Sequence, residues 1–240
     1  MFPRSWRVPA LVVLPAVTMA AAGLAGCGSS GGQAPRAGTV AAGTVAQHGP
    51  ITAARLRRAL LTRINGEPAA TPASSGTYAS LPEVRAERQS TRASDILPKS
   101  CARGALAGLE TTALAGAPAA AVTFKVGRNG IAETLVALTQ NAALAVLSRP
   151  LPPGCGHYRA RAGGKTYRYT VKERTVTGIG EQARVLNVQT SGQPGSEIWS
   201  VVYHGAGFIG AITVVGPEAS EVAVRELGLQ AYGFAAKSLS

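Results

Sequence analysis

The sequence predicts an α+β fold, in which an antiparallel β-sheet of about five to six strands is covered by helices on one face. Three observations lead to this prediction. Residues 165–174 alternate apolar and polar side chains with a period of two, which is typical of a half-buried strand. Further runs of strand-like composition follow and are joined by glycine turns. Amphipathic helical segments stand before, between and after these strands, so the order of elements is that of an α+β domain.

The first predicted helix covers residues 51–64, where Leu56 and Leu60 recur at a spacing of four and arginines occupy the remaining positions. Thr52 is the predicted N-cap, because a threonine hydroxyl can accept a hydrogen bond from a free amide of the first turn. Residues 67–100 are polar and rich in proline. They are expected to form a long covering loop with at most one short strand.

The next elements are a hairpin and a second helix. The two strands of the hairpin are predicted at residues 119–126 and 131–138. The turn between them is predicted at Arg128-Asn129-Gly130, because an Asn-Gly pair tolerates a positive φ. Thr139 can cap a helix that continues through Leu147.

The C-terminal half is predicted to be a four-stranded meander closed by a helix. Its strands are expected at residues 165–174, 183–190, 197–204 and 208–215. The last helix opens after Gly216-Pro217-Glu218, and its apolar stripe is predicted to contain Val222, Leu227, Leu229, Tyr232 and Ala236.

The N-terminus carries an export signal. Leu24-Ala25-Gly26-Cys27 follows a short apolar run, with Arg4 and Arg7 before it, and this arrangement resembles bacterial lipoprotein signal peptides. The resemblance implies removal of residues 1–26, acylation of Cys27 and a place on the extracytoplasmic face of the cell membrane. An ordinary secretory signal with an incidental cysteine is the alternative.

The segment after Cys27 has no periodic apolar pattern. Residues 27–50 are rich in Gly, Ser, Ala and Thr, and they are expected to form a flexible tether between the anchor and the domain. The predicted domain then covers residues 51–240, a length sufficient for one hydrophobic core.

Two cysteines remain once Cys27 is assigned to the anchor. An even pair in an oxidising compartment predicts a disulfide between Cys101 and Cys155. The alternative is two free buried thiols. A zinc site is not expected, because the two cysteines lack the paired spacing of such sites.

The chain has a formal net charge of +12. An exported protein is not expected to meet nucleic acid, so the predicted partners are the membrane through the acyl anchor and an anionic lipid, a glycan or an envelope protein.

Two stretches of the second half, residues 177–185 and 198–205, resemble secreted actinobacterial lipoproteins with a sensor-like extracellular domain. That domain is also similar to the extracellular part of some mycobacterial receptor serine/threonine kinases. The stretch Thr177-Gly178-Ile179-Gly180-Glu181-Gln182-Ala183 matches the family's Leu-Gly-Asp-Glu-Ala pattern loosely, with Gln182 in place of a second acid. The second stretch, from Ile198 to Gly205, precedes a strand and a closing helix. The kinase-linked members have a second cysteine pair that this chain lacks, and the resemblance brings no catalytic residue.

Residues suited to catalysis are few. The histidines are His48, His157 and His204, and Asp95 is the only aspartate. A secreted hydrolase would need one of these histidines beside a carboxylate and a nucleophile, and no Gly-x-Ser-x-Gly motif supports that arrangement. No metal-binding motif and no cofactor are predicted.

A basic strip is the predicted binding site. An anionic ligand could meet several of its cations at once, although a charged face that only keeps the sheet soluble is the alternative. The strip consists of Arg159, Arg161, Lys165, Arg168, Lys172 and Arg174.

These observations favour a membrane-anchored extracytoplasmic lipoprotein that acts by binding, as a sensor-like accessory module of the cell envelope, and not as an enzyme. The alternatives are a secreted hydrolase and a lipid carrier. A carrier would require a large apolar cavity.

Overall fold

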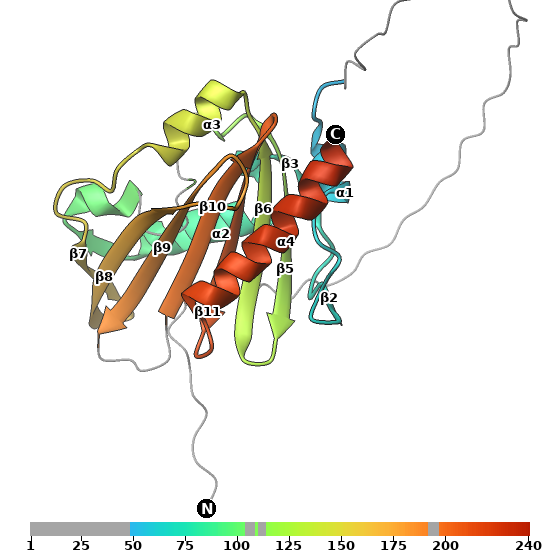
Figure 1. Ribbon diagram of the computed structural model, residues 1–240. Helices are drawn as coiled ribbons and strands as arrows, with labels where there is room; N and C mark the ends of the chain where they lie inside the picture. The colour runs from blue at the N-terminus through green and yellow to red at the C-terminus, as the bar shows by residue number, and fades with distance from the viewer. Residues whose placement is uncertain (1–48, 104–108, 110–113, 192–196) are drawn as a thin grey trace, which may run out of the picture.

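The computed structural model describes residues 49–103, 109, 114–191 and 197–240. These residues form a fold that is mostly β, so the predicted α+β class was wrong (Figure 1). The main sheet has nine antiparallel strands in the order β3-β5-β6-β11-β10-β9-β8-β7-β4. The strands are β3 (Ser74–Thr77), β4 (Asp95–Leu97), β5 (Pro118–Val126), β6 (Asn129–Ala137), β7 (His157–Ala162), β8 (Lys165–Val176), β9 (Gln182–Ser191), β10 (Glu197–Gly205) and β11 (Phe208–Gly216).

The predicted number of strands was wrong. The six predicted strands are present as β5, β6, β8, β9, β10 and β11, with ends close to the expected ones. The sheet also contains β3, β4 and β7. β3 reads Ser-Ser-Gly-Thr and β4 has only three residues, so neither has a recognisable apolar alternation. Pairing with β5 and β7 holds these two edge strands, and that pairing is a tertiary effect.

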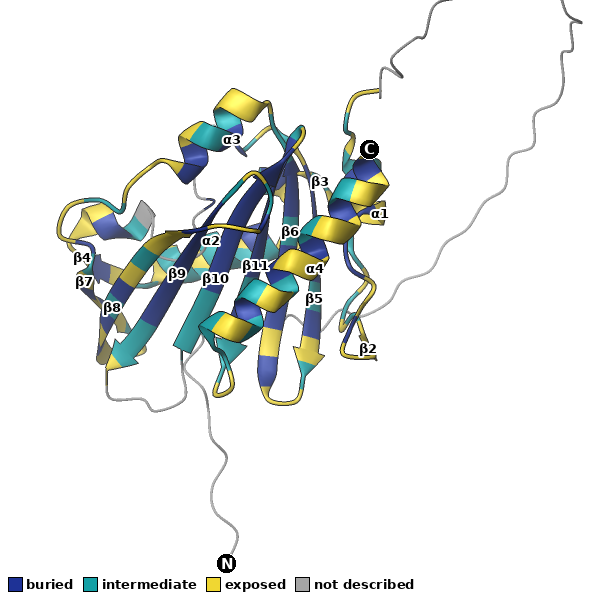
Figure 2. Cartoon of the chain, viewed as in Figure 1, coloured by how far each residue is buried: buried dark blue, intermediate teal, exposed yellow. Residues whose placement is uncertain are grey.

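Helices cover both faces of the sheet, and the prediction of helices on one face was also wrong. The helices of the described residues are α1 (Ala53–Arg58), α2 (Pro82–Ala93), α3 (Gln140–Leu147) and α4 (Glu221–Leu239). The α4 face of the sheet carries Val122, Leu135 and Val201, which pack against α1 and α4. The opposite α2 face carries Ala121, Val136 and Val202, which pack against α2 and α3. Neighbouring strand residues alternate between the two clusters, as the pleat requires. Figure 2 shows that the central strands of the sheet are largely buried.

α1 is shorter than predicted. Thr52 caps it as expected, since its hydroxyl accepts a hydrogen bond from the Arg55 amide at 3.3 Å. The helix ends at Arg58, and the Leu61 amide then donates to the buried carboxylate of Glu133 at 2.8 Å. The chain continues into the small hairpin of β1 (Arg63–Ile64) and β2 (Glu67–Pro68).

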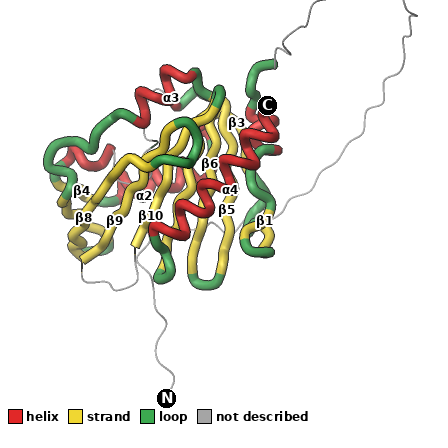
Figure 3. The backbone as a smooth tube through the Cα atoms, viewed as in Figure 1, coloured by secondary structure: helices red, strands yellow, loops and turns green. Residues whose placement is uncertain are grey.

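The predicted covering loop at residues 67–100 contains regular structure. After β3 and the short 3-10 helix η1 (Tyr78–Ser80), α2 crosses to β4 and the 3-10 helix η2 (Lys99–Arg103) (Figure 3). α2 buries only one residue, Val84, so its sequence offers almost no apolar stripe. Pro82 at its first turn suits a helix start.

The turn of the β5–β6 hairpin also differs from the prediction. Val126 pairs with Asn129, so the two loop residues are Gly127 and Arg128, and Gly127 has a φ of 58°. Asn129 lies in the strand, where its side-chain oxygen accepts a hydrogen bond from the Glu218 amide at 3.1 Å.

The helix α4 is present, but the apolar stripe predicted for it was wrong in part: Leu227 and Tyr232 pack against the core, whereas Val222 and Leu229 do not. Val222 and Leu229 are 66% and 49% exposed. The helix instead buries a row of mostly small residues, namely Val224, Gly228, Ala231, Ala235 and Leu239. A Cβ on Gly228 would lie 2.7 Å from Val201, so α4 approaches the sheet too closely for a larger side chain.

The predicted disulfide is present. Cys101 and Cys155 are bonded and join η2 to the segment before β7. Both are buried in a third cluster on the α2 face, together with Tyr158, Tyr167 and Tyr169. Predicted residues 1–26, Cys27 and all but the last two residues of the predicted tether lie outside the described residues.

Candidate binding surface

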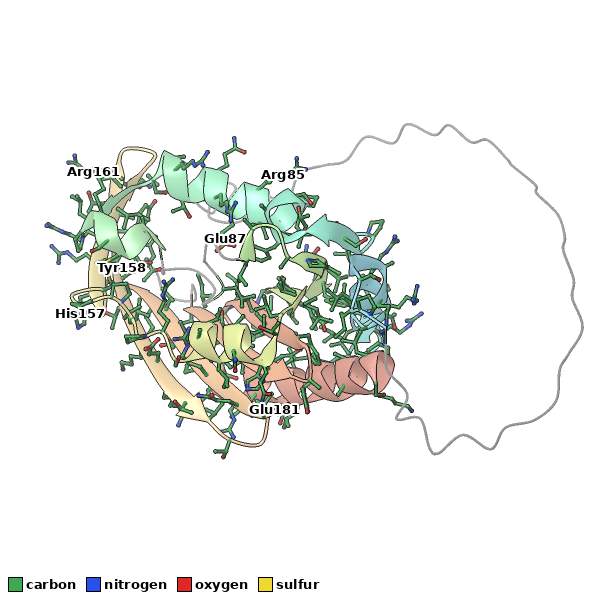
Figure 4. The ribbon with its side chains drawn as sticks, turned by 90° about the horizontal axis from the view of Figure 1, so that it is seen from above. Arg85, Glu87, His157, Tyr158, Arg161 and Glu181 are labelled. Carbon is green, nitrogen blue, oxygen red and sulfur yellow. A yellow bond between two sulfur atoms is a disulfide. The ribbon has the colours of Figure 1, made fainter. Side chains whose placement is uncertain are left out.

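Four cations of the predicted strip share one face of the sheet. Arg159 and Arg161 alternate with buried residues on β7, and Arg168 and Lys172 do so on β8. Arg159 lies directly opposite Arg168 in the antiparallel register. These four side chains, hereafter the basic sheet face, lie on the same side of the sheet as α4, beyond the strands that α4 covers. In Figure 4, Arg161 and His157 lie at the outer margin of the molecule, and Tyr158 is turned inward.

The other two cations of the strip are placed differently. Lys165 is at the start of β8, two residues before the buried Tyr167. Side chains two residues apart on a strand point to the same side, so Lys165 lies on the α2 face, opposite the other cations. Arg174 is on the correct side but forms an ion pair with Glu221 at the start of α4. The structure therefore places five of the six residues on one side of the sheet, and the four of them without an ion pair in the described part of the chain form the basic sheet face.

The basic sheet face has little compensating negative charge. No ion pair joins any of its four cations to an acidic side chain of the described residues. Asp95 pairs with Arg161 in the strand register, but its carboxylate forms an ion pair with Lys99. That ion pair, together with the weaker effect of the Arg161 charge, lowers the pKa of Asp95. Arg159 and Arg168 are like charges in directly opposed positions, which destabilises a sheet by a few tenths of a kcal/mol to about 1 kcal/mol.

The margin of this face contains an exposed apolar residue. Leu97 pairs with Arg159 and is 42% exposed. A shallow hollow of about 210 Å³ lies here, lined by Asp95, Leu97, Arg159, Ala160, Arg161 and Thr166.

A polar network borders the basic sheet face on β9 and β10. Glu197 accepts hydrogen bonds from Trp199 at 2.9 Å and from Gln189 at 3.2 Å. The Trp199 ring packs partly into the core beneath α4. This glutamate is hydrogen-bonded within the protein and forms no ion pair with the cations of β7 and β8 among the described residues.

The two histidines in the described residues lie apart from each other. His157 is exposed, and its ring nitrogen lies 3.3 Å from the Thr170 hydroxyl. His204 is 1% exposed, and its Nδ1 lies 3.8 Å from Oε2 of Glu181, which also accepts a hydrogen bond from Gln140. No described contact places a serine beside either histidine, so the geometry that a hydrolase would need is not found in the described residues.

Glu133 is a buried carboxyl group that was not among the predicted functional residues. Glu133 on β6 is fully buried between Ile131 and Leu135, and burial raises its pKa to about 8. Its Oε1 has no hydrogen-bond partner among the described residues, and neither has the buried hydroxyl of Tyr203. The burial of Tyr203 and its proximity to Glu133 raise the pKa of that phenol. A glutamate at an inward position of an alternating strand was the sequence signal that could have identified it.

A second buried charge fastens the segment after α3 to the sheet. Arg184 on β9 donates to the Arg149 carbonyl and lies 3.6 Å from Glu173 on β8. Glu173 in turn accepts a hydrogen bond from the Leu151 amide at 3.1 Å. Burial lowers the pKa of Arg184, and the charge of Glu173 opposes that effect. Both side chains have structural partners, so we assign them to the scaffold.

Other kinds of site have no support in the described residues. No group of three His, Cys, Asp or Glu side chains there could hold a metal ion. No described helix is both long and apolar enough to cross a membrane. A second hollow, of about 390 Å³, is lined by Arg85, Arg88, Gln89 and Arg92. Both hollows are lined mainly by charged or polar residues, whereas a lipid carrier requires a large apolar cavity.

Comparison with known proteins identifies the fold. The extracellular domain of PknH from Mycobacterium tuberculosis is similar to this chain, with a TM-score of 0.51 and 15% sequence identity, over 80% of this chain and 96% of that chain. The Rv0999 ortholog from Mycobacterium smegmatis matches 61% of this chain and 76% of its own, at 17% identity and a TM-score of 0.35. No family model matches the sequence, and no curated protein matches it. The similarity to PknH confirms the predicted resemblance to a sensor-like extracellular domain at the level of the fold.

Proposed function

We propose that this protein is a lipid-anchored, extracytoplasmic binding module of the cell envelope, with a sensor-like domain and no catalytic activity of its own. The Leu24-Ala25-Gly26-Cys27 sequence supports the anchor. The buried Cys101–Cys155 disulfide fits an oxidising compartment, and the fold is that of an extracellular domain.

The observation that carries the binding role is the basic sheet face. Four cations from two adjacent strands project from an uncovered part of the sheet. Asp95 lies opposite Arg161 in the register, but its carboxylate forms its ion pair with Lys99. Such a surface attracts anions. His157 shares this face of β7, but its described hydrogen-bond contact is with the Thr170 hydroxyl, and no described contact places a carboxylate beside it to orient it as a general base. Binding is therefore the function that the geometry supports best.

The anchor is tested by replacing the acylated residue. In the wild-type protein expressed in an actinobacterial host, we expect cleavage before Cys27, acyl chains on Cys27 and recovery in the membrane fraction. In Cys27→Ala the acyl acceptor is absent, so the modification is lost and cleavage before residue 27 fails. Intact mass spectrometry of the N-terminal peptide measures both changes.

Ser30→Ala is the matched control for that experiment, because it lies outside the lipobox and keeps the cysteine. It is expected to be processed like the wild type. Cleavage after Ala22 or Ala25 without acylation, with release of the protein from the membrane, would contradict the anchor.

A further inference from the structure

We propose that the basic sheet face docks on the anionic lipid headgroups of the membrane that carries the protein. The inference rests on the proposed function and names the partner of that same surface. The face consists of Arg159, Arg161, Arg168 and Lys172.

The shape of the face fits an extended surface better than a small ligand. The register places Arg161 opposite Thr166 and Arg159 opposite Arg168, and Lys172 lies further along β8. The cations therefore span six residues of β8, or about 20 Å at the rise of a strand. The adjoining hollow of about 210 Å³ is below the usual range for small-molecule pockets, and Asp95 is part of its lining.

The chemistry of the face favours lipid headgroups over a glycan. Sugar recognition commonly uses an exposed Phe, Tyr or Trp platform, but the outward positions of β4, β7 and β8 within the described ranges hold none of these residues. Trp199, on the same side of the sheet, is half-buried and packs against the core beneath α4. The tyrosines of β7 and β8 all lie on the inner side, where Tyr158 stacks on Tyr169 at 4.7 Å. The exposed Leu97 adds an apolar side chain next to the cations, which suits the boundary between headgroups and acyl chains.

The length of the chain before the domain permits this docking. α1 packs on β5, and β5 is six strands away from β7 in the sheet. At the usual strand spacing this separation is about 29 Å along the sheet. The residues from 28 to 50 would span roughly 24–29 Å on average as a flexible linker, and about 75 Å if fully extended. An anchor at Cys27 thus leaves the basic sheet face within reach of the bilayer.

The unpaired charges supply the driving force. Arg159 and Arg168 repel each other across the strand pair, and phosphate groups between them would relieve that repulsion. Each basic residue near an anionic leaflet strengthens binding by about fivefold, and salt weakens the attraction.

The test is co-sedimentation of the chain from residue 28 with lipid vesicles, which keeps every described residue and removes the acyl acceptor. Vesicles of phosphatidylglycerol mixed with phosphatidylcholine are compared with vesicles of phosphatidylcholine alone, at low and high salt. We expect binding to the anionic vesicles only, and loss of binding at high salt. Arg159→Gln/Arg168→Gln is expected to weaken the partition coefficient by about 25-fold.

Arg85→Gln/Arg92→Gln is the charge-matched control, because these exposed arginines lie on α2, across the sheet from the basic sheet face. It removes the same net charge and is expected to change binding less than twofold. An equal loss in both double variants, or no preference of the wild type for anionic vesicles, would overturn the proposal. The chain used in the vesicle assay lacks Cys27, so an absence of vesicle binding does not affect the acylation experiment. The proposed acyl anchor and the proposed docking on lipid headgroups are therefore tested independently.

Discussion

Glu133 and Tyr203 form an unusual pair of polar residues inside the core. Both lie on the α4 face among apolar residues, and each has an oxygen without a hydrogen-bond partner in the described part of the chain. Tyr203 passes close over β11, where a Cβ on Gly210 would lie 2.4 Å from its ring. The Leu61 amide is the hydrogen-bond donor to Glu133, so the carboxyl group connects the end of α1 to the sheet.

The buried carboxyl group predicts a pH-dependent stability. Its pKa of about 8 exceeds the ordinary value of 4.5, so the folded protein binds more protons than the unfolded chain between these values. The free energy of unfolding should therefore fall as the pH rises from 5 to about 8, by about 3–5 kcal/mol from this group. Urea unfolding at several pH values measures the decrease.

Glu133→Gln isolates this effect, because glutamine keeps the acceptor for the Leu61 amide and does not ionise. The free energy of unfolding of this variant should change much less between pH 5 and 8. The difference in this free energy between the variant and the wild type should therefore shift in favour of the variant as the pH rises. Parallel curves for the two proteins would show that Glu133 does not cause the pH dependence.

At the scale of elements, the disulfide joins two parts of the sheet margin that have few other constraints. Cys101 is in η2, just after the three-residue strand β4, and Cys155 precedes β7. β4 pairs only with β7 in the main sheet. The bond thus holds the edge that carries Leu97 and the arginines of β7.

Removal of the disulfide is expected to destabilise the protein. Cys101 and Cys155 are 54 residues apart, so the chain-entropy model gives a loss of about 4 kcal/mol for Cys101→Ala/Cys155→Ala. Chemical denaturation of the variant measures the loss. The reduced wild type is the control and should show a similar shift, whereas an unchanged unfolding midpoint in both samples would contradict the prediction.

At the scale of the molecule, stability should vary across the sheet. β10 and β11 have hydrogen-bonded neighbours on both sides, α4 on one face and α3 on the other. β3 and β4 are edge strands of four and three residues. The helices therefore protect the centre of the sheet, while the binding surface lies toward its β4 margin.

Native-state hydrogen exchange should reveal this gradient. We expect the slowest amide exchange in β10 and β11 and the fastest in β3 and β4, because local opening requires less buried area at the edges. Mass spectrometry of peptides from each strand measures the rates. Equal protection of β4 and β11 would contradict the expected gradient.

Much of the fold was predictable from local patterns. The six strands with clear alternation, the caps at Thr52 and Thr139 and the Cys101–Cys155 bond are all found in the structure. β7 was missed although its residues alternate, and the residues of α2 gave no apolar stripe to detect. Five residues of the predicted strip do share a face, although Arg174 is ion-paired with Glu221, and Lys165 lies on the other side of the sheet.

By itself, the sequence determined the central strands, the disulfide and the resemblance to a sensor-like extracellular domain, because these follow from side-chain alternation, cysteine number and short motifs. Only the tertiary structure decided which helices cover which face, which side of α4 is buried, and that Glu133 lies in the core. Those outcomes depend on how closely distant segments approach. Gly228 against Val201 and Leu61 against Glu133 are contacts between residues far apart in the sequence, which no local pattern encodes.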